Sequence, residues 1–169
     1  MTLRTTLALA ALLAGLAACQ DERPAQTTPL EIKQDTACAL DGMLLADYPG
    51  AKAQIHYAQG EPEFFCDTVE MFSLYLKPEQ ARRIAALYVQ DMGETDIKAP
   101  KGHWIDARQA FYVQGSSQQG SMGPTLVPFG QRAKAEAFAQ QYGGKVLAFA
   151  DVKPEMVRLD GGALHDSHM

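Results

Sequence analysis

Apolar and polar positions in the first half of the chain predict two strands, a helix and a further strand in succession. Residues 53–58 form a short run of β-like character, and residues 87–90 form another. Between them, apolar side chains over 69–76 recur at the spacing of one helical face. Asp67 followed three positions later by Glu70 is the pattern of a helix capping box, so we expect the helix to begin there.

The second half of the chain repeats this order of elements. Residues 110–114 and the stretch PTLVPF at 124–129 predict two strands joined by a glycine-rich turn. An alanine-rich run over 131–142 predicts a helix that the pair Gly143-Gly144 ends, and KVLAFADV at 145–152 predicts a closing strand. The stretch FFCDTVEMFSLYL…AALYVQD can therefore be aligned with LVPFGQRAKAEAFA…KVLAFAD.

This alignment indicates an internal duplication and an α+β fold of two small homologous ββαβ units. Units of this size bury little apolar surface alone, so we expect the two to pack together. The first unit is expected at residues 36–99, the second at 100–153, and a C-terminal tail at 154–169.

The N-terminal residues have the features of an export signal. Arg4 precedes an apolar run that ends in the letters LAA directly before Cys19, and the run is too short for a comfortable membrane span. A cysteine in this position resembles the bacterial lipobox, in which the cysteine is acylated and becomes the mature N-terminus. We therefore expect a lipoprotein signal at 1–18, and a lipidated Cys19 with a polar, flexible tether at 19–35.

Composition and charge narrow the class of partner. The chain has 169 residues, a formal net charge of −5 and a pI of about 5.3. It has no basic stripe, so we do not expect it to bind nucleic acid. After the signal, no segment is apolar and long enough to cross a bilayer. We expect a periplasmic domain held by the lipid on Cys19 to a membrane, which we assign to the outer membrane.

Residues with soft or borderline donor atoms suggest a metal. Thiolate and thioether ligands select Cu(I), and imidazole can join them. The dense acidic loop of a calcium site is missing, and so are the closely spaced Cys and His pairs of structural zinc. Six residues are candidate copper ligands: Met122, Met43, Cys38, Asp41, His103 and Cys66.

Met122 stands between glycines in the stretch GSMGP, where the chain turns, although methionine usually belongs in a core. Cys38, Asp41 and Met43 occupy another glycine-containing loop, which we take as the equivalent loop of the first unit. If the units pack about a pseudo-two-fold axis, these loops face one another. Met122 would then be a thioether ligand opposite Cys38 and Met43.

Each candidate also has a purely structural interpretation. Met122 and Met43 would pack as ordinary apolar side chains, and His103 would satisfy a turn. Cys38 and Cys66 would form a disulfide, because exported proteins with two cysteines usually do so. The remaining donors, His165, His168 and Met169, lie in the expected tail.

The chain also resembles a known family, NosL, the periplasmic copper lipoproteins of nitrous oxide reductase maturation. The resemblance rests on CALDGMLLADYPG, EFFCDTVEMFSLYLKPEQ, YVQDMG, HWIDARQAFYV, GSMGPTLVPF and GGKVLAF, in this order after the lipobox. It implies two ββαβ units that bind one Cu(I). It also implies delivery of that copper to nitrous oxide reductase, with an ABC-type membrane assembly machine as the working partner.

Many members of that family carry C-x-x-C-G-M in the first loop, whereas this chain has aspartate in place of the second cysteine. A site with two thiolates in that loop is therefore not expected. The order in which we expect copper ligands is Met122 and Met43, then Cys38 and Asp41, then His103 and Cys66.

Three functions compete. The first is a Cu(I) chaperone with no enzymatic activity. The second is a structural or accessory outer-membrane lipoprotein with a Cys38–Cys66 disulfide and no metal. The third is a thiol enzyme with one of these cysteines as nucleophile. The motifs of serine hydrolases, zinc proteases and phosphate-binding loops are missing, and we expect the first function.

Overall fold

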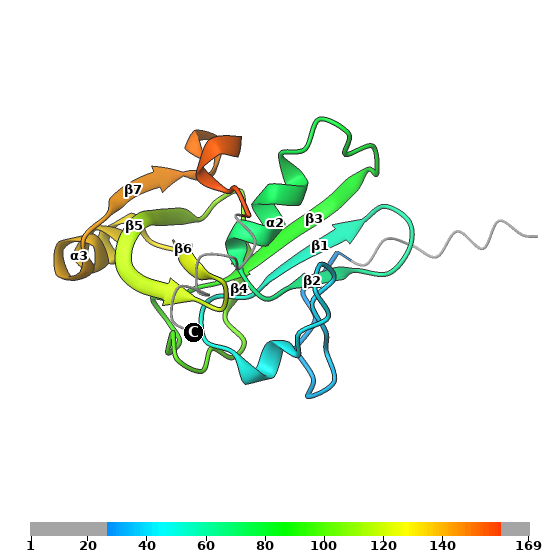
Figure 1. Cartoon of the computed structure of the whole chain (residues 1–169), viewed down its shortest axis with the longest axis horizontal. Coiled ribbons are helices and arrows are strands. Elements are labelled where there is room, and N and C mark those ends of the chain that lie inside the picture. The colour runs from blue at the N-terminus through cyan, green and yellow to red at the C-terminus, as the bar shows by residue number, and fades with distance from the viewer. Residues whose placement is uncertain (1–26, 160–169) are drawn as a thin grey trace, which may run out of the picture.

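The computed structural model describes residues 27–159, and its elements follow the predicted order. Figure 1 shows two sheets, with β1 and β3 on the right and β5, β7 and the helix α3 on the left. The strand orders are β2-β1-β3-β4 in a four-stranded sheet and β6-β5-β7 in a three-stranded sheet. All paired strands are antiparallel. The α+β class is therefore confirmed.

The two units have the same topology, in which the first strand of each unit lies between the second and the third. The elements of the first unit are β1 (Ala53–Tyr57), β2 (Glu63–Phe65), α2 (Thr68–Tyr75) and β3 (Ile84–Gln90). Those of the second are β5 (Phe111–Gly120), β6 (Gly123–Phe129), α3 (Arg132–Tyr142) and β7 (Lys145–Ala148). The short strand β4 (Trp104–Asp106) lies in the range expected for the second unit but pairs with β3.

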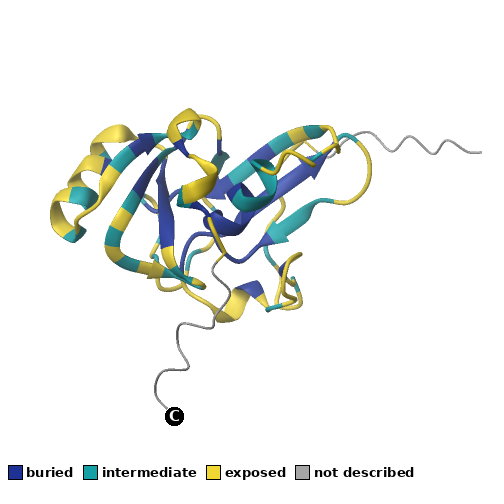
Figure 2. Cartoon of the chain, turned by 45° about the horizontal axis from the view of Figure 1, so that its top comes forward, coloured by how far each residue is buried: buried dark blue, intermediate teal, exposed yellow. Residues whose placement is uncertain are grey.

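Strand β1 is buried on both faces, and Figure 2 shows it in dark blue. Ala53, Ile55 and Tyr57 face the main core, which they share with side chains of α2. On the other face, Gln54 accepts a hydrogen bond from Leu30 N at 3.0 Å and donates one to Leu30 O at 2.6 Å. The folded part therefore begins within the range expected to be a flexible tether.

The units are joined where β6 meets the N-terminus of α2. Thr68 Oγ1 donates to the carbonyl oxygen of Leu126 at 2.6 Å, and Thr125 Oγ1 donates to Asp67 Oδ1 at 2.7 Å. All four residues are buried. Strand β6 of the second unit thus supports the first turn of the first unit's helix.

Two short helical turns, η3 (Phe149–Asp151) and η4 (Pro154–Met156), follow β7. A third, η2 (Leu45–Asp47), precedes β1. Val157 is buried in the main core, so the expected tail begins with packed residues. The signal at 1–18, Cys19 and the donors after residue 159 lie outside the described residues. Within residues 27–159, no helix has the length and apolar character that a membrane crossing needs.

Candidate metal centre

The start of α2 brings a carboxylate against the thiol of Cys66. Asp67 is the N-cap and accepts from Val69 N at 2.9 Å, which completes one half of a capping box. In the other half, Glu70 Oε2 accepts from Asp67 N at 3.3 Å and from Cys66 N at 3.1 Å. Because a capping box folds its third helical residue back over the cap, Glu70 lies beside Cys66.

Cys38 and Asp41 come from the loop before η2. Ala39 N donates to Phe64 O at 2.8 Å, which holds this loop against the end of β2. Within the loop, Cys38 N donates to Met43 O at 2.8 Å, and Met43 N donates to Asp41 Oδ1 at 2.9 Å. These bonds place the Cys38 thiol at the start of α2.

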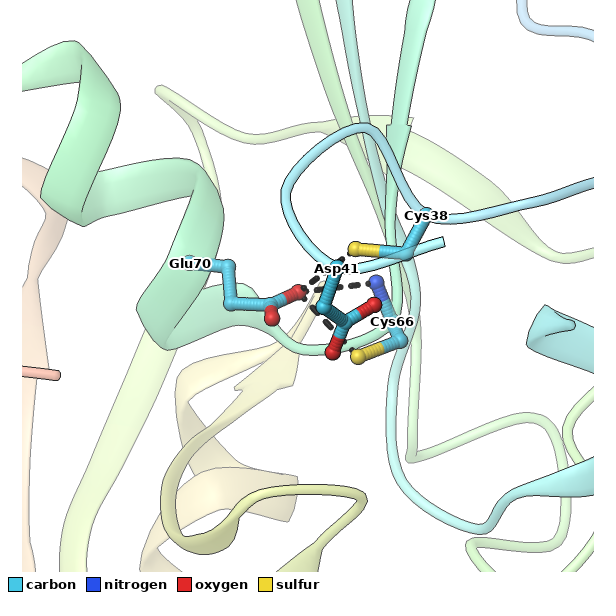
Figure 3. Close-up of side chains that lie close together, drawn as sticks. All are labelled: Cys38, Asp41, Cys66 and Glu70. Carbon is cyan, nitrogen blue, oxygen red and sulfur yellow. Dashed lines mark hydrogen bonds between the residues drawn. The ribbon is translucent and has the colours of Figure 1, made fainter. Parts of the chain in front are cut away.

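Glu70 points between the two thiols (Figure 3) and accepts from Cys38 Sγ at 3.2 Å and Cys66 Sγ at 3.1 Å. Ligand atoms of Cys38, Asp41, Cys66 and Glu70 all lie within 4.8 Å of one another. Two sulfurs bound to one ion at about 2.3 Å each lie at most about 4.6 Å apart, so a small contraction would let these donors share an ion. Asp41 is exposed and the other three are buried, so the centre opens on one side.

Both cysteines are free thiols. The structure therefore does not show the Cys38–Cys66 disulfide that the structural alternative requires.

The two thiols differ in acidity. The hydrogen bond from Cys66 lowers the pKa of Cys38, against the opposing effect of burial. The same bond, together with burial and the neighbouring Glu70, raises the pKa of Cys66. When both thiols are protonated they donate to Glu70, and once Cys38 loses its proton it accepts from Cys66. Since a metal binds the thiolate form, the Cys66 proton is the harder of the two for a metal to displace.

Asp67 adds a further buried acid beside this pair. Burial raises its pKa to about 6, and the bond from Thr125 opposes the shift. Its Oδ2 is buried and has no hydrogen-bond partner. The first turn of α2 therefore concentrates negative charge in a poorly solvated place.

The two candidate methionines lie on segments that approach the cysteines. Met43 is half-buried and packs against the small apolar cluster that contains Cys38 and Cys66. Met122 is 43% exposed in the turn between β5 and β6, and the preceding Ser121 donates from Oγ to Cys66 O at 2.6 Å. Whether either methionine binds the metal stays a prediction.

The expected equivalence of the two loops is wrong, however. The turn that contains Met122 joins the first two strands of its unit, and its counterpart is the connection at residues 58–62 between β1 and β2. The loop of Cys38 and Met43 precedes β1 and has a different place in the duplication. The turn of Met122 reaches Cys66 because β6 packs against the start of α2.

His103 is not brought to the centre. It is exposed, has a φ of 51°, and immediately precedes β4, which lies at the opposite edge of the sheet from β2. Its carbonyl oxygen accepts from Asp91 N at 2.8 Å, and its ring acts electrostatically on Glu94. This placement is the turn role that we considered for it.

Comparisons with known proteins agree with this arrangement. The NosL family model matches residues 29–157. The chain belongs to the NosL family. It is 37% identical over 166 residues to the copper-binding lipoprotein NosL of Stutzerimonas stutzeri, covering 94% of this chain and 87% of that relative. It is 39% identical over 155 residues to the copper-binding lipoprotein NosL of Achromobacter cycloclastes, covering 88% and 80%.

The NosL fold is also shared. The crystal structure of the copper chaperone NosL from Shewanella denitrificans is similar to this chain with a TM-score of 0.73 and 36% sequence identity, covering 77% of this chain and 98% of that one. The family resemblance inferred from the sequence motifs is thus confirmed.

Sequence reasoning about this NosL family member missed Glu70 as a member of the centre. The signal was present, because a capping box directly after a cysteine must place its glutamate next to that cysteine. Chemically, the centre offers two soft thiols and two hard carboxylates, and the thioether of Met43 packs against the cluster of the two cysteines.

Proposed function

We propose that this chain is a copper carrier that binds one Cu(I) ion at Cys38 and Cys66. The proposal is carried by two buried free thiols within 4.8 Å of one another at the point where the segments of Met43 and Met122 meet. Thiolate and thioether ligands together favour Cu(I) over harder ions. Asp41 and Glu70 flank the two sulfurs.

The open side of the centre supports a carrier rather than a permanent metal site. Asp41 and Met122 are exposed, and both belong to turns rather than to regular elements. Such ligands can be exchanged for those of a partner, whereas a closed site of four fixed ligands resists exchange. No catalytic step is needed for this function.

The cellular setting extends the same proposal. The carrier would be anchored by a lipid on Cys19 to the outer membrane, facing the periplasm. It would deliver copper to nitrous oxide reductase through an ABC-type membrane assembly machine. The names of the relatives, copper-binding lipoprotein and copper chaperone, support the carrier and lipoprotein parts of this proposal.

The first test is an anaerobic Cu(I) titration of the reduced full-length protein in detergent against a competing chelator. We expect one-to-one binding that weakens at least about 100-fold in Cys38→Ser and Cys66→Ser, and about tenfold in Met122→Ala. Because Met122 is 43% exposed, its removal should change the apo free energy of unfolding by less than about 0.5 kcal/mol.

Met122→Leu is the matched control, since it keeps an apolar side chain but lacks the thioether sulfur. It should bind Cu(I) as weakly as Met122→Ala. Absence of Cu(I) uptake by the reduced protein would remove the carrier function, and a large loss of apo stability in Met122→Ala would make Met122 a packing residue.

A further inference from the structure

Lys52 is a buried lysine that contacts the backbone of Cys66, a residue of the candidate metal centre. Lys52 is only 1% exposed and immediately precedes β1. Its Nζ donates to Pro49 O at 2.8 Å and to Cys66 O at 3.1 Å. Lysine is rarely buried so completely, because its ammonium group must leave water. The two carbonyl oxygens hold this group next to a proposed copper ligand.

The acidic groups that act on Lys52 are those of the centre. Burial lowers its pKa, and the groups that oppose this shift are, in order, Cys66, Asp67, Glu70 and Cys38. Three of these four supply ligand atoms to the cluster. Because Nζ is bonded to the carbonyl oxygen of Cys66, its positive charge lies beside this cluster, in surroundings with little water to screen it.

Thioether ligands favour Cu(I), but the four clustered donors by themselves do not distinguish copper from zinc. Two cysteines with two carboxylates also suit Zn(II), which takes sulfur and oxygen ligands in tetrahedral sites. A carrier of Cu(I) therefore needs a further source of discrimination. The Coulomb energy between a fixed ammonium group and a bound ion is proportional to the ion's charge, so a divalent ion is repelled about twice as strongly as a monovalent one.

We propose that Lys52 sets the charge selectivity of the metal centre, favouring monovalent Cu(I) over divalent Zn(II). This role rests on the proposed function, because it requires that the ion bind at Cys38 and Cys66. Lys52 does not ligate the ion. It is a positioning and charge-balancing residue that acts through the carbonyl oxygen of Cys66 and through space.

The test compares two ions with filled d shells, Cu(I) and Zn(II), in wild type and in Lys52→Met. Dissociation constants are measured by chelator competition on the reduced full-length protein, and the result is the ratio of the two affinities. The protons released by the shared thiols affect both ions alike, so they cancel in this ratio. We expect the affinity for Zn(II) relative to Cu(I) to rise about tenfold in Lys52→Met.

Two controls separate charge from structure. Lys101→Met removes an exposed lysine that lines the same cavity as Lys52, and solvent screening should keep its effect on the ratio below about twofold. Ser121→Ala removes the other donor to Cys66 O without changing any charge, so it measures how far the loss of a hydrogen bond at this oxygen by itself moves the ratio. Cys66→Ser checks that both ions use this centre.

Lys52→Gln is a second neutral variant that keeps a hydrogen-bond donor. An unchanged ratio in a folded Lys52→Met or Lys52→Gln protein would overturn the proposal, and so would failure of both variants to fold, since Lys52 would then be structural. If wild type binds no Cu(I), the proposed function fails first. If wild type binds Cu(I) and the ratio does not move, only the role of Lys52 fails.

Discussion

At the level of single residues, Glu70 serves the helix and the metal centre with the same oxygen atom. Its Oε2 accepts from Cys66 N and Asp67 N, and also from both thiols. Hydrogen bonds to a charged acceptor are stronger than those between neutral groups, and here the acceptor is only 2% exposed. The stability of the first turn of α2 is therefore tied to the protonation of the cysteines.

We expect Glu70→Gln to lower the apo free energy of unfolding by about 1–2 kcal/mol, because the neutral amide oxygen is a weaker acceptor for four donors. Urea unfolding measures this loss. The control is Glu136→Gln on α3, where the exposed side chain lies 3.6 Å from Arg132 in an i,i+4 pair. That change should remove less than about 0.5 kcal/mol. Equal losses of stability in the two variants would show that the four hydrogen bonds to Glu70 Oε2 do not stabilise the fold more than an exposed ion pair does.

At the level of elements, the two units differ at the second residue before the helix, which in the first unit is the proposed copper ligand Cys66. Phe65 ends β2 and α2 begins at Thr68, just as Phe129 ends β6 and α3 begins at Arg132. Gly130 therefore occupies the place of Cys66. A Cβ atom on Gly130 would lie 2.6 Å from Asp91 Oδ2, so a side chain there meets a neighbouring loop. The second unit has kept the topology without the thiol.

The β5–β6 hairpin instead contributes its turn to the first unit's centre. The hairpin lies close to the start of α2, because a Cβ atom on Gly120 would lie 1.9 Å from Asp67 Oδ2. It also lies close to the segment before β1, because a Cβ atom on Gly50 would lie 2.6 Å from Gly120 Cα. Glycine at these positions lets the turn of Ser121 and Met122 lie against the start of α2.

Gly120→Ala should therefore displace the turn, since the added methyl group overlaps the carboxylate of Asp67. We expect a loss of about 1–3 kcal/mol in the free energy of unfolding and at least about tenfold weaker Cu(I) binding. Thermal unfolding and the chelator titration measure the two effects. Ser117→Ala, at an exposed position of the same strand, should change neither noticeably. Unchanged Cu(I) binding in Gly120→Ala would show that the turn of Ser121 and Met122 does not contribute to copper binding.

At the level of the whole molecule, both units contribute to the surroundings of the centre. The first unit supplies the cysteines and Glu70, while the second supplies Thr125 to the N-cap and the turn with Met122. Buried hydrogen bonds link Thr68 and Asp67 to β6. The units therefore have too many shared polar contacts to unfold independently.

We expect a single unfolding transition in which Trp104 fluorescence, which reports on the first sheet, coincides with far-ultraviolet circular dichroism of the whole chain. Thr125→Val should shift both signals together by about 1–3 kcal/mol, because Asp67 loses a buried donor. Thr95→Val is the control, since its hydroxyl bonds to Lys101 N in an exposed loop. Two separated transitions would contradict the shared interface.

The sequence by itself determined the features that depend on local order. Periodicity and turn residues predicted the order of elements in both units and the residues of both helices and most strands, although not those of β2 and β4. Asp67 with Glu70 marked the start of α2, because these signals act over a few neighbouring positions. The series of motifs in their order along the chain was sufficient to identify the NosL family. Which of the named candidates bind copper stays a prediction.

Only the tertiary structure decided which of these residues meet. Cys38, Cys66 and the turn of Met122 are far apart in sequence and converge because β6 packs on α2, while His103 is carried to the far edge of the sheet. The capping box puts Glu70 beside Cys66, but neither its bond with Cys38 nor the contact of Lys52 with Cys66 follows from spacing. Long-range packing sets such contacts, and a local pattern carries no information about it.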